Sequence, residues 1–168
     1  PEKVPKSEVL DDWQLLPTKP DWAASFSDIW TPGEGAARER LDDFADGVID
    51  GYKTDRDFPA IDATSLLSPH LAFGEISPAR VWHATRGLTS SKDDIVHFRK
   101  ELAWREFCCH LHFHFPDLAE KNWNERFDAF PWEAAGKNFE LWTRGMTGYP
   151  IVDAGMRQLW ATGWMHNR

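Results

Sequence analysis

The stretch "SKDDIVHFRKELAWREFCCHLHFHFP", residues 91–116, carries the strongest helical pattern of the chain. Ser91 is a typical N-cap residue, and the acidic Asp93 and Asp94 suit the positive end of a helix dipole. Pro116 cannot continue a helix, because it lacks the backbone N–H. These signals predict one long helix that begins after Ser91 and ends just before Pro116.

This long helix is apolar on most of its sides, which is typical of a buried helix. A turn of about 100° per residue brings Phe98, Glu101, Trp104, Arg105 and Cys108 onto one face. Charges on a buried helix are paired or face a cavity. Two interpretations therefore stay open for Glu101 and Arg105, which stand one turn apart. They form either a structural bridge or part of a polar and aromatic wall of a ligand cavity.

Helix signals also dominate the rest of the chain, whereas strand signals are weak. Apolar residues at steps of three and four predict a helix from Glu34 to about Tyr52. Ser68-Pro69 and Ser77-Pro78 each resemble a cap followed by proline at the first helical position, and the second helix should end near Gly87. Further helices are expected over residues 137–144, before Gly145, and from Pro150 onward. The sequence therefore predicts an all-α fold.

Two segments lack such patterns. Residues 1–32 contain five prolines and no lasting period, so we interpret them as an extended linker that follows a surface through Trp13, Trp22 and Trp30. Residues 117–136 are expected to form a loop with aromatic anchors at Trp123, Phe127, Phe130 and Trp132.

The composition bounds the class of protein. The 168 residues are 42% hydrophobic and 27% charged, which indicates a folded domain rather than a disordered or membrane-spanning one. The net charge of −8 argues by itself against a nucleic-acid surface, so DNA binding would need a local patch. Cys108 and Cys109 are adjacent, so they fit neither a stapling disulfide nor a zinc spacing, and we expect a reducing, cytoplasmic setting. The ten tryptophans fill a large aromatic core, or some of them face a flat ligand.

Two further clusters could carry chemistry. Hydroxyls at Thr64, Ser65 and Ser68 precede a predicted helix start, which suits either a phosphate or simple capping. His110, His112 and His114 alternate along a helix end. His110 and His114 could chelate a metal, but no third ligand supports this, so surface or capping histidines are the preferred interpretation and no metal site is expected.

The last predicted helix is an ordinary amphipathic one, with Asp153 and Arg157 expected to pair one turn apart. The residues that follow it, Trp164 to Arg168, add an indole, an amide and a guanidinium beyond the apolar stripe. An apolar helix face does not require those residue types.

Four motifs now identify a resemblance: "TSLLSPHLAFGEISP" (64–78), "ELAWREF" (101–107), "FDAFPW" (127–132) and "TGYPIVDAGMRQLWATGWMHNR" (147–168). Together they resemble the flavin-binding helical domain of the photolyase/cryptochrome family, most of all bacterial photolyases that act on cyclobutane pyrimidine dimers. The resemblance runs from about Trp13 to Arg168. It implies that residues 1–32 are the tail of an interdomain linker, and that residues 33–168 are the N-terminal part of the FAD-binding helical domain, truncated at its C-terminus.

The resemblance implies a folded FAD as cofactor. Its phosphates would lie at the residues that match the family's phosphate loop, namely Tyr52, Thr64, Ser65, Leu66, Leu67 and Ser68. The flavin cavity would be lined by Phe98, Arg105 and Trp164. Leu66 departs from the pattern, because many relatives carry a basic residue there. The chromophore of an antenna domain lies outside this sequence, and we expect this stretch to be inactive alone.

Other positions match residues that act on DNA. By resemblance, Glu101 hydrogen-bonds a flipped dimer, Trp104 stacks on it, and Asn167 lies between the dimer and the flavin side. The positions that match DNA contacts are Arg56, Glu101, Trp104, Arg105, Asn167 and Arg168. Trp132 matches the surface member of the tryptophan chain that reduces the flavin in light.

The implied activity is light-driven repair of pyrimidine dimers in UV-damaged DNA, the reaction of a deoxyribodipyrimidine photo-lyase, which is a carbon–carbon lyase. We expect a cytoplasmic monomer without a membrane segment. The alternative is a cryptochrome, a blue-light signalling protein on the same fold. An indole at Trp104 and an amide at Asn167 favour repair, because many cryptochromes lack one of them.

Overall fold

The computed structural model describes residues 6–168, so residues 1–5 of the predicted linker lie outside the described part. Between residues 6 and 168 every regular element is helical and no strand occurs, which confirms the all-α prediction. The chain forms two compact units. One contains the described residues up to Thr31 together with Ala135–Met165, and the other contains Pro32–Ala134 and His166–Arg168. The predicted domain boundary after residue 32 stays a prediction.

None of the helices in the described range is both long and apolar enough to cross a bilayer.

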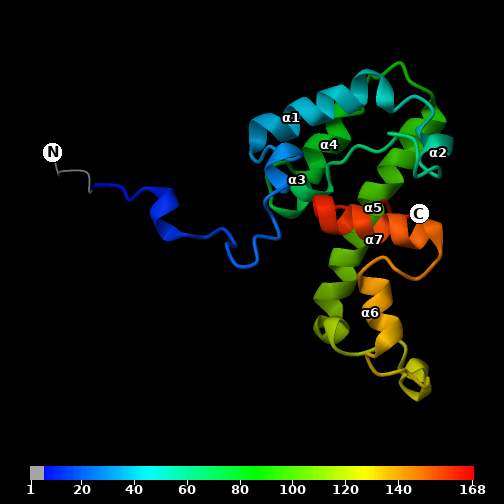
Figure 1. The fold of residues 1–168 in the computed structure, drawn as a ribbon. Helices are drawn as coiled ribbons and strands as arrows, with labels where there is room; N and C mark the ends of the chain where they lie inside the picture. Colours follow the sequence, from blue (N-terminus) through cyan, green and yellow to red (C-terminus); the bar gives the residue numbers. More distant parts are fainter. Residues whose placement is uncertain (1–5) are drawn as a thin grey trace. The chain divides into compact units, whose positions relative to one another are not determined.

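The larger unit is built from five α-helices around one core: α1 (Glu34–Asp43), α2 (Tyr52–Asp55), α3 (Ser68–Ala72), α4 (Pro78–Ala84) and α5 (Lys92–His114) (Figure 1). Both α2 and α4 pack on α5. Ile49, Leu67 and Val81 are fully buried in this core. Burial of such a side chain stabilises a fold by about 1.5–3 kcal/mol. The core therefore fixes the first half of α5 against the short helices.

The expected helix from Glu34 to Tyr52 is broken in the structure. After α1 the chain widens into a π-helical turn over Phe44–Val48, where Gly47 takes a φ of 146° that no helix allows. As a result Ile49 is fully buried, while Val48 of the predicted apolar stripe is exposed. The single-helix prediction was wrong because a glycine inside the periodic stretch shifts the register.

Local capping signals predicted most other helix ends correctly. Ser77 Oγ accepts a hydrogen bond from the Arg80 N–H at 3.2 Å at the start of α4, and Ser91 Oγ accepts one from Asp93 N–H at 3.3 Å at the start of α5. Ser68 is different, because it is the first residue of α3 and makes no side-chain cap bond. The end of α4 at Ala84 also precedes the predicted end near Gly87.

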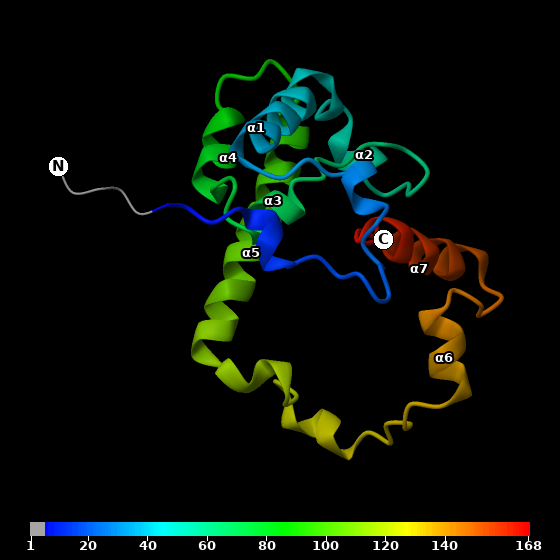
Figure 2. The same cartoon turned by 60° about the vertical axis from the view of Figure 1, so that its left-hand side comes forward.

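The long helix α5 is buried over only half of its length. Its buried residues are Asp94, Ile95, Phe98 and Leu102, all in the first half. Figures 1 and 2 both show the second half running away from α1 and α4. Phe107 and Phe113 are exposed there. The prediction of a helix buried throughout was therefore wrong for the second half, because no helix of the same unit covers it in the described part of the chain.

The smaller unit contains α6 (Lys137–Thr143) and α7 (Pro150–Thr162), which pack on each other, and two short 3-10 turns, η1 (Leu10–Trp13) and η2 (Phe26–Asp28). The segment around η2 docks on the end of α7, where the Trp30 indole N–H donates to the Thr162 carbonyl at 2.7 Å. Gly163 ends α7 with a φ of 71°, and a Cβ there would approach the Phe26 ring to 2.8 Å. Only glycine fits this close approach.

A buried carboxylate holds the turn before α7. Asp153 accepts hydrogen bonds from the Thr147 N–H and hydroxyl, both at 2.7 Å, and from the Gly148 N–H at 2.9 Å. Arg157 donates instead to the Asp153 carbonyl at 3.0 Å. The predicted Asp153–Arg157 side-chain pair was therefore wrong, because three nearer donors in the turn satisfy the carboxylate.

Candidate functional site

The site begins at the face of α5 that the sequence singled out. Along this face exposure increases steadily, from Phe98 at 3% through the Glu101 side chain at 38% to Trp104 at 61%. The Phe98 ring packs in the core against Phe44 at 4.6 Å and Tyr52 at 5.5 Å between ring centroids. The face therefore connects the core to the surface, and it presents a carboxylate and an indole to solvent one after the other.

Glu101 forms its ion pair with Arg56, the residue that directly follows α2. Arg56 is 7% exposed. It also donates to the Tyr52 hydroxyl at 3.3 Å and lies over the Tyr52 ring at 5.2 Å. A buried guanidinium requires a counter-charge, and Glu101 supplies it. The pair in turn fixes the direction of the Glu101 carboxylate.

The predicted pairing of Glu101 with Arg105 does not form. Arg105 Nη1 instead binds Glu106 Oε1 at 2.6 Å, and Nη2 donates to the Leu71 carbonyl at 3.5 Å. The interpretation as a structural Glu101–Arg105 bridge was therefore wrong, because the partner of Glu101 directly follows α2 rather than lying on α5. The interpretation as part of a cavity wall stays a prediction.

Tyr52 is a neutral hydrogen-bond partner in this cluster. Burial raises the pKa of Tyr52 to about 12, with the nearby Arg56 acting in the opposite direction. The phenol therefore stays protonated at neutral pH. The negative charge that balances Arg56 therefore comes from carboxylates, Glu101 in direct contact and Asp57 at 4.0 Å, and not from Tyr52.

The short helix α2 is anchored by a carboxylate of α5. Asp94, which is buried, accepts hydrogen bonds from the Gly51 N–H at 3.1 Å and the Lys53 N–H at 2.8 Å. The two N–H groups lie at the start of α2 and have no partner inside the helix. Asp94 thus positions the helix that carries Tyr52 and leads into Arg56.

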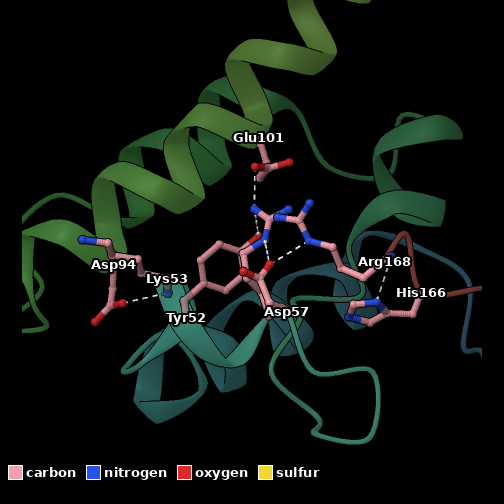
Figure 3. A network of polar contacts seen from close by, with 8 residues as sticks. Tyr52, Lys53, Asp57, Asp94, Glu101, His166 and Arg168 are labelled. Atoms are coloured by element: carbon pink, nitrogen blue, oxygen red, sulfur yellow. Dashed lines mark hydrogen bonds and ion pairs between the residues drawn. The ribbon is translucent and has the colours of Figure 1, made fainter.

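A second ion pair lies beside the first. Figure 3 shows Asp57 and Arg168 pointing toward one another, and Arg168 Nε binds Asp57 Oδ1 at 2.7 Å. Arg168 also donates its backbone N–H to His166 Nδ1 at 3.2 Å. The sequence predicted Arg56, Glu101 and Arg168 as site residues, and the structure brings these three together in one polar network.

The predicted phosphate loop has an unusual backbone. Leu66 takes a φ of 51°, in the left-handed region that non-glycine residues rarely adopt, while Leu67 is right-handed and buried. Adjacent residues of opposite hand turn successive N–H groups toward one side, which makes a small anion-binding concavity. Thr64, Ser65 and Leu66 are half-buried and Ser68 is exposed. The Leu67 N–H donates to Ser65 Oγ at 3.4 Å, so the loop has both hydroxyls and backbone N–H groups of the kind that phosphates bind. The assignment of this loop to the phosphates of FAD stays a prediction.

The remaining predicted residues lie elsewhere. Trp164 is half-buried in the smaller unit, where its backbone N–H donates to Thr162 Oγ1 at 3.1 Å, and Asn167 is exposed in the larger unit. Trp132 is 65% exposed and donates its indole N–H to the Phe127 carbonyl at 3.0 Å. The roles given to these residues stay predictions.

The aromatic residues between 117 and 136 are not anchors in the described structure. The segment contains two 3-10 turns, η4 (Pro116–Ala119) and η5 (Glu125–Ala129), and its four aromatic side chains are exposed: Trp123, Phe127, Phe130 and Trp132. Phe130 and Trp132 instead pair with each other at 4.7 Å between ring centroids.

Residues 6–168 contain no group of three metal-ligand side chains, and the His110 and His114 rings lie edge to face at 4.4 Å.

Sequence reasoning missed three carboxylates that shape these sites: Asp57, Asp94 and Asp153. Asp94 could have been found from the sequence, because it lies in the first turn of a predicted helix, next to residues that are buried. Asp57 gave no signal, because its partner Arg168 lies far along the chain. Asp153 was assigned to the wrong partner, Arg157, although its donors Thr147 and Gly148 lie close before it in the sequence.

The comparisons with known proteins agree with this geometry. Residues 98–168 match the family model described as the FAD binding domain of DNA photolyase. A deoxyribodipyrimidine photo-lyase of Agrobacterium fabrum is 68% identical over 100% of this chain and 36% of the relative. Cryptochrome-2 of Arabidopsis thaliana is 33% identical over 93% of the chain and 30% of the relative.

A solved structure supports the same assignment. The crystal structure of a bacterial class III photolyase from Agrobacterium tumefaciens superposes with a TM-score of 0.93 at 68% identity, over 100% of this chain and 35% of that one. The chain is therefore similar to the FAD-binding domain of DNA photolyases. It spans about a third of the length of the curated relatives it matches.

Proposed function

We propose that the whole protein carrying this chain repairs cyclobutane pyrimidine dimers in DNA by light-driven electron transfer, as a deoxyribodipyrimidine photo-lyase. The observation that supports the proposal best is that two groups share one face of α5. They are the partly exposed Glu101 carboxylate, which Arg56 holds, and the exposed Trp104 indole. An apolar helix face needs neither of these groups at the surface. A flat, polar ligand needs both.

The chemistry of a dimer matches these groups. A dimer stacks poorly in the duplex, so it flips out more easily than a normal base. Trp104 offers a stacking surface, and base–indole stacking contributes about 1–3 kcal/mol. The Glu101 carboxylate can accept hydrogen bonds from the pyrimidine N–H groups, and Arg56 keeps it aimed. Asn167, Arg105 and Arg168 complete the proposed DNA contacts.

FAD is the cofactor of this proposal. Tyr52, Thr64, Ser65, Leu66, Leu67 and Ser68 would hold its phosphates, and Phe98 and Arg105 would lie toward the flavin. Bound FAD supplies the light-excited electron donor. The protein's own contribution is to bind and orient the cofactor and the dimer and to fix the charges around them.

The organisation and setting belong to the same proposal. Residues 1–32 would be the tail of an interdomain linker and residues 33–168 the first part of the helical domain. Both cysteines are free and exposed. Free exposed thiols suit a reducing cytoplasm, where the protein would act as a monomer on UV-damaged DNA.

A photorepair assay tests the proposal. The whole protein is mixed with an oligonucleotide that contains one thymine dimer and kept in blue light or in darkness. Loss of the dimer in light alone is expected. Intact dimers after illumination of the flavin-loaded protein would contradict the proposal.

The second candidate is a cryptochrome photoreceptor, favoured by the similarity to Cryptochrome-2 of Arabidopsis thaliana. The same assay separates the two candidates. A protein that absorbs blue light through its flavin but leaves dimers intact would support the cryptochrome.

A further inference from the structure

The Asp57 carboxylate lies between two guanidinium groups. Its Oδ1 atom is 2.7 Å from Arg168 Nε and 4.0 Å from Arg56 Nε. Figure 3 shows the Asp57 side chain turned toward Arg168 within the network that includes Glu101. Asp57 therefore sits where the two cations of the proposed lesion site meet.

The two cations differ in what already holds them. The Arg56 side chain is 8% exposed and is committed to Glu101 and Tyr52. The Arg168 side chain is 48% exposed, and the Asp57 side chain is 53% exposed. An exposed ion pair is weak and exchanges readily. Asp57 thus controls the direction of Arg168 without locking it.

We propose that Asp57 is a positioning residue that determines lesion specificity, because it holds Arg168 beside Glu101 and away from ordinary backbone phosphates. This inference rests on the proposed function. Phosphate contacts give affinity but carry no information about the bases. An Arg168 side chain released from Asp57 would bind any phosphate within reach, and the site would lose one negative charge that repels undamaged DNA.

Two consequences follow for an Asp57→Asn protein. Its affinity for undamaged DNA should rise, because Arg168 becomes available to a phosphate. Its affinity for dimer-containing DNA should not rise with it, because Arg168 is no longer pre-oriented at the lesion. The ratio of the two affinities therefore falls, by about three- to fivefold for an exposed pair. One added phosphate contact also steepens the salt dependence for undamaged DNA by roughly 0.9 in log–log slope.

The experiment measures binding of the flavin-loaded whole protein to two matched duplexes, one with a single thymine dimer, over a range of salt concentrations. Asp57→Asn is compared with Asp62→Asn, which removes the same charge from an exposed residue for which the described structure records no ion pair. Asp57→Glu tests rescue, because it restores a negative carboxylate that can accept the hydrogen bond from Arg168. Flavin absorbance and the melting temperature confirm that each variant is folded.

The expected result is a lower lesion preference and a steeper salt slope for Asp57→Asn, normal values for Asp62→Asn, and recovery in Asp57→Glu. Adding Arg168→Gln to Asp57→Asn should bring the salt slope back. If the wild-type protein prefers dimers but Asp57→Asn and Asp62→Asn change binding equally, the inference about Asp57 is overturned and the proposed function stands. A wild-type protein without any preference for dimers would overturn the proposed function and, with it, this inference.

Discussion

The Arg56 guanidinium, which is 7% exposed, forms its ion pair with the Glu101 carboxylate of α5. The pair joins the end of α2 to the middle of α5 and leaves part of the carboxylate open to solvent. It therefore serves two purposes. It compensates a buried cation, and it aims a carboxylate beside an exposed indole.

Glu101→Gln keeps the shape of the side chain and removes its charge. We expect repair to slow by about tenfold or more, because a pre-oriented charge at the reacting group is lost. The free energy of unfolding should fall by about 1 kcal/mol, less than for a fully buried pair, because Glu101 is partly solvated. Single-turnover photorepair and urea unfolding measure the two effects.

The matched control for this variant is Glu34→Gln, which breaks an exposed pair with Arg38 at 2.9 Å on α1. Repair should be unchanged in the control. Flavin content should stay within about twofold of wild type in both variants. If the Glu101→Gln protein repairs at the wild-type rate, Glu101 does not take part in repair.

Trp104→Ala should weaken binding to dimer-containing DNA. The loss of one base–indole stack corresponds to about 1–3 kcal/mol, or about 5- to 150-fold in Kd. Stability should change little, because the indole is mostly exposed and its contact with Phe107 is an edge contact at 5.8 Å. Phe113→Ala removes an exposed aromatic ring from the same helix and is the control. If both variants bind the lesion as wild type does, Trp104 does not face it.

Trp132→Phe separates photoreduction from repair. Phenylalanine can keep the ring contact with Phe130, but it cannot supply an oxidisable indole. Light-driven reduction of the flavin should be largely lost, while repair by chemically reduced protein should stay normal. Trp123→Phe, also at an exposed site, is the comparison. Normal photoreduction in Trp132→Phe would exclude Trp132 from the electron path.

The fold was predictable where the signals are local. Ser91 and Pro116 bound α5, Pro150 starts α7, and Gly145 follows α6, because caps, prolines and glycines act within one turn of themselves. The break at Gly47 was missed because an apolar stripe continues on either side of it. The exposed second half of α5 was missed because periodicity reports an apolar surface and not what covers it.

The sequence named three residues of the polar network but not how they pair, and their roles stay predictions. Glu101, Arg56 and Arg168 were identified by resemblance, yet the sequence suggested Arg105 as the partner of Glu101. Helical spacing proposes neighbours one turn away, whereas Arg56 reaches Glu101 from another helix. Asp57 was missed for the same reason, since its partner Arg168 lies far along the chain.

The pH dependence of stability gives a test of the turn at Asp153. The Thr147 hydroxyl, helped by the N–H groups of Thr147 and Gly148, holds the pKa of Asp153 below its usual value, although burial acts in the opposite direction. A carboxylate whose pKa is lowered on folding stabilises the fold above its unfolded pKa, which is about 3.9 for Asp. That contribution is lost as the pH falls through the lower pKa of the folded state.

Asp153→Asn should therefore lower the Tm of the whole protein by about 2 °C at pH 7. The difference from wild type should stay constant down to about pH 5 and shrink below the unfolded pKa, because the wild-type carboxyl then takes up its proton. Melting curves from neutral to acidic pH measure this, with Asp42→Asn on the exposed side of α1 as the control. If the Tm difference between wild type and Asp153→Asn stays unchanged in acid, the charge of Asp153 does not hold the turn. The amide would then disrupt the turn by its shape.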